Sequence, residues 1–437
     1  MAIVIEKPPW ISVEWNSKST LLIPDLSNEV WTYTMTPEEE ALHLLRKRIN
    51  KYETDEGMSD WEYYKKIVNP YELIYTQKKY TNFPESVCLL HPLSRSYFKL
   101  IEILSITNFY DQFIKNKAQH VRSAHVCEGP GGFIEAFIDQ CSKYRIENYS
   151  SSAITLRPKQ ANVPGWKRAA TFLKKNRNIK IVYGPDDTGD ILNYANQNAF
   201  IEECSKKVHV FTGDGGFDFS MDYDSQEQTI FSLLVVSVRI GFEVLQHGGL
   251  FVLKFFDIYH SKTQELIQLL SGHFIKWTLY KPATSRPCNP EIYFVGNKFC
   301  PPSPSVLNML RSWSKSLCET AAATAAATAA TAAVVESNSS SSEACSVQAI
   351  NTIITPNPYI LKTIASSVRK QTSYLEKVFS LIEEADAAKK TGAITKQLKD
   401  HEIISYHWCK HFSVPIYLER HRSIEALHTY LQVVDPP

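Results

Sequence analysis

Several features that mark particular protein classes are missing from this sequence. Its nine cysteines include no C-x-x-C pair, and their odd number and irregular spacing argue against a disulfide framework and a zinc ribbon. The longest apolar stretch, Phe231 to Leu245, is interrupted by Arg239 and Glu243 and is too short to span a bilayer. The first ten residues contain Lys7 and two prolines where a signal peptide needs an apolar run. We therefore expect a soluble protein with reduced thiols, located in the cytoplasm or the nucleus.

Neither sign of charge dominates the chain. The 47 lysines and arginines nearly balance the 46 aspartates and glutamates, which leaves a net charge of +1. Any nucleic-acid-binding surface must therefore be local, because the whole chain is not a polycation. The apolar and charged fractions, 44% and 21%, are ordinary for a globular protein, and 437 residues allow two or three domains.

A low-complexity segment divides the chain. Residues 321–334 read AAATAAATAATAAV and residues 336–343 read ESNSSSSE; the interleaved threonines and the serines favour a mobile linker. Before it, an N-terminal extension is rich in Trp, Tyr and Pro. After it, residues such as Tyr374–Ala388 have apolar side chains at helical spacing, which predicts a helical domain for packing or partner contacts. The predicted parts are an N-terminal extension (1–90), an α/β domain (91–317), the linker (318–348) and a C-terminal helical domain (349–437).

The α/β domain is predicted from short apolar, β-branched runs that alternate with longer helical patterns, an alternation typical of a mostly parallel sheet. The expected strands are Ala124–Cys127, Ser151–Leu156, Ile179–Tyr183, Val208–Thr212, Leu250–Phe255, Ile275–Tyr280 and Ile292–Gly296. The expected helices are Ser94–Phe113, Phe133–Cys141, Ala161–Lys174 and Gln226–Gln246.

Glycine is scarce, with 16 residues in the chain, yet half of them lie in three clusters. The first cluster, in the string C-E-G-P-G-G-F at residues 127–133, lies between an expected strand and an expected helix, where ligands bind in open α/β sheets. The pattern is not G-x-G-x-x-G and no G-K-[ST] follows, so a dinucleotide or a nucleoside triphosphate is less expected than another adenosine-bearing ligand. A plain tight turn is the alternative. The other clusters are at residues 213–216 and 248–249.

Four charged residues lie on or next to the expected strands and helices of the α/β domain. Asp214 follows an apolar strand in the second glycine cluster, where it could also simply cap a turn. Lys254 lies within the apolar run L-F-V-L-K-F-F, so it must either reach solvent at a frayed strand end or meet a carboxylate. Glu291 precedes the last expected strand, and Lys99 lies on the first expected helix. Taken singly, both are ordinary surface residues.

Together these segments resemble the FtsJ-type RNA ribose 2′-O-methyltransferases, over roughly residues 90–300, about half of the chain. The supporting strings are C-E-G-P-G-G-F, D-G-G-F, L-K-F-F-D and K-P-A-T-S-R-P-C-N-P-E-I-Y. The sequence is most similar to the cap-specific branch and to related proteins of large DNA viruses, which leaves a viral origin open. The resemblance implies a Rossmann-like methyltransferase fold with a mostly parallel seven-stranded sheet, S-adenosylmethionine as cofactor, and RNA, in particular the capped 5′ end of mRNA, as substrate.

The resemblance also assigns roles to individual residues. It implies a catalytic tetrad of Lys99, Asp214, Lys254 and Glu291, in which Lys254 acts as the base or orients the 2′-oxygen. The cofactor would contact Glu128, Gly129, Pro130, Gly131, Gly132, Phe133, Thr155, Leu156, Asp190 and Asp214. Ser285 and Arg286 would contact the substrate; for Arg286, binding of RNA phosphate and pairing with a carboxylate are equally weighted. No metal is expected.

Three alternatives stay open at this point. A methyltransferase-like subunit could bind RNA without catalysis, although the intact tetrad speaks against that interpretation. The methylated RNA could be ribosomal or transfer RNA. A Rossmann oxidoreductase is disfavoured, because G-x-G-x-x-G does not follow the first expected strand.

Overall fold

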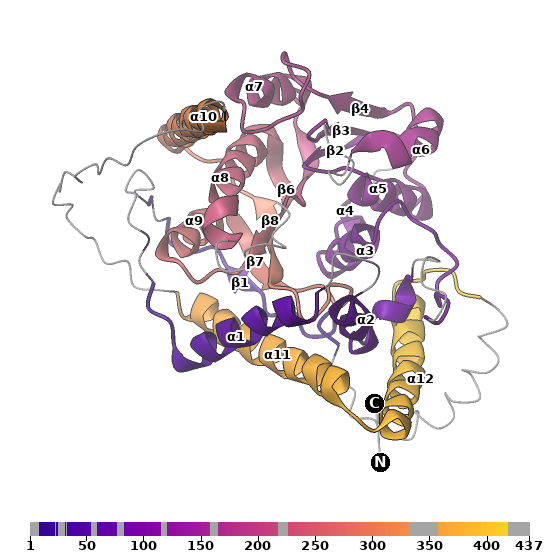
Figure 1. The fold of residues 1–437 in the computed structure, drawn as a ribbon. Coiled ribbons are helices and arrows are strands. Elements are labelled where there is room, and N and C mark those ends of the chain that lie inside the picture. Colours follow the sequence, from indigo (N-terminus) through magenta and orange to yellow (C-terminus); the bar gives the residue numbers. More distant parts are fainter. Residues whose placement is uncertain are drawn as a thin grey trace, which may run out of the picture.

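The computed structural model describes residues 8–21, 23–24, 31, 33–53, 59–76, 83–114, 120–157, 165–216, 226–332 and 357–417. Its centre is an eight-stranded sheet with helices on both faces, and the strand order is β1-β7-β8-β6-β5-β2-β3-β4 (Figure 1). The strands are β1 Asn16–Ser17, β2 Val121–Val126, β3 Tyr149–Ile154, β4 Ile179–Val182, β5 Val208–Gly213, β6 Leu245–Phe256, β7 Phe274–Tyr280 and β8 Glu291–Phe299.

All seven strands expected from the sequence are present, and the two-residue β1 adds the eighth at the edge beside β7. Strands β4, β3, β2, β5 and β6 are parallel to one another, whereas β8 runs antiparallel to both β6 and β7. Strand β5 is buried along its whole length, as expected for a strand covered on both faces. The Rossmann-like α/β arrangement with a mostly parallel sheet is therefore confirmed.

Helices fill a layer on each side of the sheet (Figure 1). One buried core contains α3 and α5, and the other contains α8, α9 and α10. The helices are α1 Pro37–Lys47, α2 Asp60–Ile67, α3 Ser96–Ile106, α4 Asp111–Ile114, α5 Gly132–Lys143, α6 Ala170–Lys175, α7 Tyr194–Glu203, α8 Gln226–Val244, α9 Ser261–Ser271, α10 Pro304–Ala332, α11 Pro358–Glu383 and α12 Ala387–His411. Short 3-10 helices occupy Arg48–Lys51, Glu72–Ile74 and Trp166–Ala169.

Three predicted helices differ from the structure in their extent or continuity. The helix expected at Ser94–Phe113 is divided into α3 and α4 by a turn in which Asn108 has a φ of 50°. The helix expected at Ala161–Lys174 is described only from Trp166 onward, as a 3-10 turn followed by α6, and residues 158–164 lie outside the described residues. The pattern at Tyr374–Ala388 runs past the end of α11 at Glu383, beyond which Asp386 caps the start of α12.

The start of the predicted linker is helical in the structure. Helix α10 continues through the alanine run to Ala332, and residues 333–356 lie outside the described residues. Alanine has the highest helix propensity, and extending an existing helix avoids the cost of nucleation. The expectation of a mobile linker from residue 318 was therefore wrong for its first part.

The segments before and after the α/β domain pack against each other. Helix α1 contacts α11, and α12 contacts α2 and the 3-10 helix at Glu72–Ile74. Arg46 of α1 forms a bidentate ion pair with Asp257, just after β6, and also donates to Gln371 of α11 at 2.7 Å. Both segments add side chains to the two cores around the sheet. The division into four parts stays a prediction, but the described flanking helices have no core of their own.

In the part of the chain that the structure describes, no helix is both long enough and apolar enough to cross a membrane.

Candidate active site

The four residues of the predicted tetrad lie near one edge of the sheet. Asp214 directly follows β5, and Lys254 is close to the end of the parallel neighbour β6. Strand β8 runs in the opposite direction, so its first residue, Glu291, pairs with Phe256 at the end of β6. Lys99 comes from α3, which covers this face of the sheet. Segments nearly 200 residues apart in sequence are thus brought to one place.

A tyrosine links the four charged side chains into a single hydrogen-bonded chain. The Lys99 Nζ lies 2.7 Å from Glu291 Oε1 and donates to the Tyr293 hydroxyl at 3.3 Å. The Tyr293 hydroxyl in turn donates to Asp214 Oδ1 at 2.7 Å. Lys254 completes the chain, because its Nζ donates to the Asp214 carbonyl oxygen at 2.8 Å and lies 3.2 Å from Oδ1.

Sequence reasoning missed Tyr293, although a signal for it was present. Side chains two residues apart on a strand point to the same face. Glu291 and Tyr293 are two residues apart at the start of β8, so Tyr293 had to share the face of Glu291. It is completely buried.

The charges in this cluster compensate one another. Burial by itself would raise the pKa of the Glu291 carboxyl, but Lys99, Lys254 and Lys281 outweigh that effect and hold it well below the usual range. Burial and the neighbouring Asp214 raise the pKa of the Tyr293 hydroxyl well above normal, so the hydroxyl remains a donor. Alternating cations and anions make a buried quartet of charges tolerable.

Small residues let the backbone approach Lys254. A Cβ atom placed on Gly216 would lie 3.0 Å from the Phe256 ring and 3.6 Å from Lys254 Nζ, and one on Gly215 would lie 3.0 Å from Cys127. A side chain at either position would crowd Phe256 or Cys127, which favours glycine in the loop that leads from β5 past Lys254.

A buried glutamate on α3 anchors the loop that leads to Glu291. Glu102 accepts hydrogen bonds from the Tyr280 hydroxyl and from the backbone N–H groups of Ala283 and Thr284, at 2.8, 2.8 and 3.0 Å. It also accepts from the indole N–H of Trp408 on α12 at 3.0 Å. Because Lys99 and Glu102 are one turn apart on α3, the same helix supplies one member of the tetrad and fixes the approach to another.

The glycine-rich turn at residues 129–132 lies between β2 and α5, as predicted. Gly131 has a φ of 110°, a conformation that L side chains rarely adopt, and a Cβ there would lie 3.2 Å from Leu93 and 3.3 Å from Trp166. Glu128 has a structural contact that the sequence did not reveal. One of its carboxylate oxygens accepts from the backbone N–H groups of Phe133 and Ile134, which begin α5.

The remaining predicted cofactor residues gather beside this turn. Thr155 Oγ1 accepts from the Gly129 N–H at 3.2 Å, and Arg157 N donates to the Thr188 carbonyl at 2.6 Å. The second bond holds the segment of Asp190 next to the end of β3. Leu156 is 44% exposed there, which is unusual for a leucine at a strand end. The structure thus brings Gly129, Thr155, Leu156 and Asp190 together, while their contacts with a cofactor stay a prediction.

The two predicted substrate residues are engaged with the protein itself. Ser285 is buried, and its Oγ accepts from Lys281 Nζ at 3.2 Å. Arg286 makes two hydrogen bonds to Glu72, at 3.0 and 2.9 Å. The structure thus shows the carboxylate pairing that was one of the two interpretations of Arg286, and a contact of either residue with substrate stays a prediction.

Among the described residues, no group of three or more His, Cys, Asp and Glu side chains is arranged so that it could hold a metal ion.

Comparison with known protein families agrees with this architecture. Residues 92–299 match the family model of the FtsJ-like methyltransferases. This segment is an FtsJ-like methyltransferase domain. It contains β2 to β8 and all four residues of the tetrad, so the resemblance drawn from the sequence is confirmed.

Curated relatives match mainly through this FtsJ-like domain. The chain is 28% identical to a cap-specific mRNA (nucleoside-2′-O-)-methyltransferase of Autographa californica nuclear polyhedrosis virus, over 39% of this chain and 61% of the relative. It is 28% identical to a probable methyltransferase of African swine fever virus, over 47% of this chain and 49% of the relative. It is 27% identical to a Drosophila melanogaster cap-specific mRNA (nucleoside-2′-O-)-methyltransferase 2, over 62% of this chain and 39% of the relative. The matches therefore span between about two fifths and three fifths of the relatives' own lengths.

Proposed function

We propose that this protein transfers a methyl group from S-adenosylmethionine to a ribose 2′-hydroxyl of RNA, at the cap-proximal nucleotide of mRNA. The observation that carries the proposal is the continuous chain of contacts through Glu291, Lys99, Tyr293, Asp214 and Lys254. Two relatives are named cap-specific mRNA (nucleoside-2′-O-)-methyltransferases, which supports the choice of RNA and of the cap.

The residues at the ends of β2 to β5 fit the proposed cofactor. Gly131 has a positive φ and packs against Leu93 and Trp166, which gives the loop after β2 the sharp turn of a glycine-rich ligand loop. The exposed Leu156 offers an apolar face for an adenine ring, and the Asp190 carboxylate lies in the neighbouring segment. Beside Gly131, the indole Nε1 of Trp166 is buried without a hydrogen-bond partner among the described residues. These features support a polar, adenosine-bearing ligand at this edge of the sheet.

When bound, S-adenosylmethionine supplies an electrophilic methyl group. In the transfer, the O–H bond of the 2′-hydroxyl and the bond from sulfur to methyl break and an O–CH₃ bond forms; the sulfur keeps the electron pair of its broken bond, and the proton passes to solvent water. The protein has to position the hydroxyl in line with that methyl and help to remove its proton. Positioning can contribute about 7–11 kcal/mol, and proton transfer by a placed group about 10²–10⁴-fold.

Lys254 is the residue that contacts the 2′-oxygen in this proposal. Asp214 fixes its ammonium group through the carbonyl oxygen and the carboxylate, which directs two of its three N–H bonds. The third N–H bond can then point at the 2′-oxygen and stabilise the negative charge that develops there. Glu291 holds Lys99, Lys99 donates to the Tyr293 hydroxyl, and that hydroxyl keeps Asp214 in place.

The proposal is tested by incubating the full chain with S-adenosylmethionine labelled in its methyl group and with short RNAs. The RNAs differ only in having a cap, an uncapped triphosphate or a hydroxyl at the 5′ end. We expect label on the first nucleotides of the capped RNA only, resistant to alkaline hydrolysis, because a 2′-O-methyl group blocks strand cleavage at that position. Label on a base, or equal labelling of the capped and uncapped RNAs, would contradict the proposal.

A further inference from the structure

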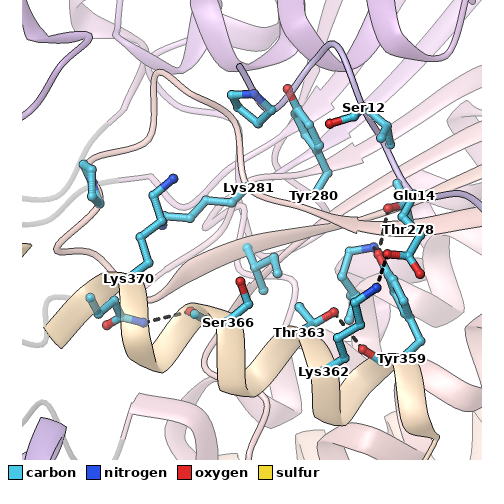
Figure 2. A pocket seen from close by; sticks show the side chains of 17 residues that line it. Ser12, Glu14, Thr278, Tyr280, Lys281, Tyr359, Lys362, Thr363, Ser366 and Lys370 are labelled. Carbon is cyan, nitrogen blue, oxygen red and sulfur yellow. Dashed lines mark hydrogen bonds and ion pairs between the residues drawn. The ribbon is translucent and has the colours of Figure 1, made fainter. Parts of the chain in front are cut away.

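A cavity of about 310 Å³ lies at the end of β7 and the start of β8, which is also where β8 supplies Glu291 to the tetrad. Three segments supply most of its lining: the stretch before β1 at residues 9–14, the end of β7 with the start of the following loop, and one face of α11 (Figure 2). Pro287 and Ile292 complete it. The residues from α11 are Tyr359, Lys362, Thr363, Ser366, Ser367, Lys370 and Gln371, which follow helical spacing.

The lining is rich in lysines and hydroxyl groups. The lining contains three lysines, one carboxylate, that of Glu14, and five serines and threonines. The lysines are Lys281, Lys362 and Lys370. Lys362 pairs with Glu14 at 2.6 Å at one end of the cavity, and Lys370 lies at the other end (Figure 2). Lysines together with serine and threonine hydroxyls are the groups that contact phosphates in protein–nucleic acid complexes.

The cavity is connected to the active site through Lys281 and β8. The Lys281 Nζ donates to the carbonyl oxygens of Asn289 and Glu291, at 2.7 and 2.9 Å. The Glu291 side chain holds Lys99 of the tetrad, whereas the next residue, Ile292, lines the cavity. Lys254 of β6, Tyr293 of β8 and Tyr280 of β7 are paired across neighbouring strands, so Tyr280 in the cavity wall is two strands away from Lys254. A polymer with its reacting ribose beside Lys254 can therefore extend along this edge of the sheet to the cavity.

We propose that the cavity between β7 and α11 binds backbone phosphates of the substrate RNA next to the nucleotide that is methylated. This inference rests on the proposed function, because that function supplies the polymeric anion. The attraction comes from Lys362 and Lys370, and the charge of the half-buried Lys281 adds to it while Lys281 holds the loop.

The test measures binding of fluorescently labelled RNA to the full chain by anisotropy, without S-adenosylmethionine. The double variant Lys362→Ala/Lys370→Ala is compared with Lys396→Ala/Lys399→Ala, which removes two exposed lysines of α12 outside the cavity. We expect the first pair to raise the Kd for a capped ten-nucleotide RNA about tenfold at low salt. It should also reduce the slope of log Kd against log salt by about 0.7 for each phosphate contact that is lost. The control pair should change neither quantity.

Two RNAs distinguish which phosphates are bound. If the cavity contacts the bridge of the cap, the double variant also weakens a capped dinucleotide; if it contacts the strand, only the longer RNA is affected. Either result supports a phosphate site. Wild-type Kd and salt slope for both RNAs would overturn it, as would loss of binding to a poly-glutamate peptide with RNA binding unchanged, which would indicate a protein partner.

Failure of the proposed function gives a different signature. If no methyl group reaches any RNA but the Lys362→Ala/Lys370→Ala variant still weakens RNA binding, the phosphate site is supported and the proposed methyl transfer is refuted. If capped RNA is methylated at the wild-type rate and KM by the lysine variant, the proposed function stands and the phosphate site does not.

Discussion

The Tyr293 hydroxyl joins the two ion pairs of the candidate active site into one connected unit. Without its hydroxyl, Lys99 with Glu291 and Lys254 with Asp214 would be two separate pairs, since the tyrosine forms the hydrogen bonds that link them. Such chains of hydrogen bonds fix each member more tightly than isolated pairs do. Residues that touch no substrate can then affect the reaction through the position of Lys254.

Replacing Lys254 with methionine should abolish methyl transfer. The Lys254→Met side chain keeps a similar length but has no N–H to direct at the 2′-oxygen, so we expect kcat to fall at least about 10²-fold. Cofactor affinity, measured by calorimetry, should stay within about threefold, because the glycine-rich turn is unchanged. The matched control is Lys180→Met, in which an exposed strand lysine that pairs with Glu203 is replaced. Full activity of Lys254→Met would contradict the assignment.

Replacing Tyr293 with phenylalanine should reduce kcat while RNA and cofactor affinities stay near wild type. The Tyr293→Phe variant loses only the hydroxyl that links Lys99 to Asp214. We expect a loss of about 10-fold, corresponding to one hydrogen bond of about 1.4 kcal/mol. Tyr110→Phe is the control, because its equally buried hydroxyl donates to the Phe137 carbonyl away from the site. Equal kcat losses in both variants would show that the effect is merely structural.

At the scale of elements, the strands position the site residues, and buried polar side chains hold neighbouring strands and loops together. Strand β2 is an example, because His125 in the middle of the sheet is fully buried. One ring nitrogen is 2.8 Å from Thr212 Oγ1 of β5, and the other is 2.8 Å from Ser123 Oγ. Burial lowers the pKa of this imidazole to about 3, so the ring is neutral in the folded protein.

The stability of the fold should therefore fall in acid. In the unfolded chain His125 takes up a proton near pH 6.5, whereas the folded chain resists protonation down to about pH 3. Its contribution is fully present above pH 6.5 and is lost as the pH falls toward 3, at about 1.4 kcal/mol for each pH unit.

Urea unfolding at pH 6.5, 5.5 and 4.5 measures this loss. We expect the slope of unfolding free energy against pH to be smaller in His125→Gln by about 1.4 kcal/mol per pH unit, which corresponds to one proton. This difference should appear even though the variant is less stable at pH 6.5. His247→Gln, at an exposed position, should keep the wild-type slope. If His125→Gln also kept that slope, the neutral state of the buried ring would be refuted.

At the scale of the whole molecule, the flanking helices are part of the fold of the FtsJ-like domain. Phe379 of α11 is 2% exposed and packs against Tyr52 and Trp61 of the N-terminal segment. The Arg48 guanidinium lies 4.4 Å from the centre of its ring. Contacts of this kind couple the two ends of the described chain to one another.

Removing the Phe379 ring should destabilise the entire chain. We expect Phe379→Ala to lower the free energy of unfolding by about 3–5 kcal/mol, because a buried aromatic ring leaves a cavity. Urea unfolding followed by tryptophan fluorescence and by far-UV circular dichroism should shift as one transition. Leu361→Ala, at an exposed position of the same helix, should change stability by less than about 0.5 kcal/mol. Two separate transitions in the wild-type protein would show that the C-terminal helices fold on their own.

Local pattern was enough to predict the elements that position the site. The alternation of apolar runs located seven strands, because each strand buries a stretch of β-branched and apolar residues. The glycine clusters marked the turns at strand ends, because those turns need backbone that carries no side chain. The family's motif, matched residue by residue, then selected Lys99, Asp214, Lys254 and Glu291 out of many similar charges.

Only the tertiary structure decided which side chains meet. The sequence could not reveal the contact of Tyr293 with Asp214, the pairing of Arg286 with Glu72, or the cap that Glu128 places on α5. These contacts join segments through space, and no periodicity along the chain records them. The helical alanine run and the packing of α1 on α11 were missed for a related reason: the stability of a helix depends on the helix it extends and on the surface it covers, and both are fixed only when the chain has folded.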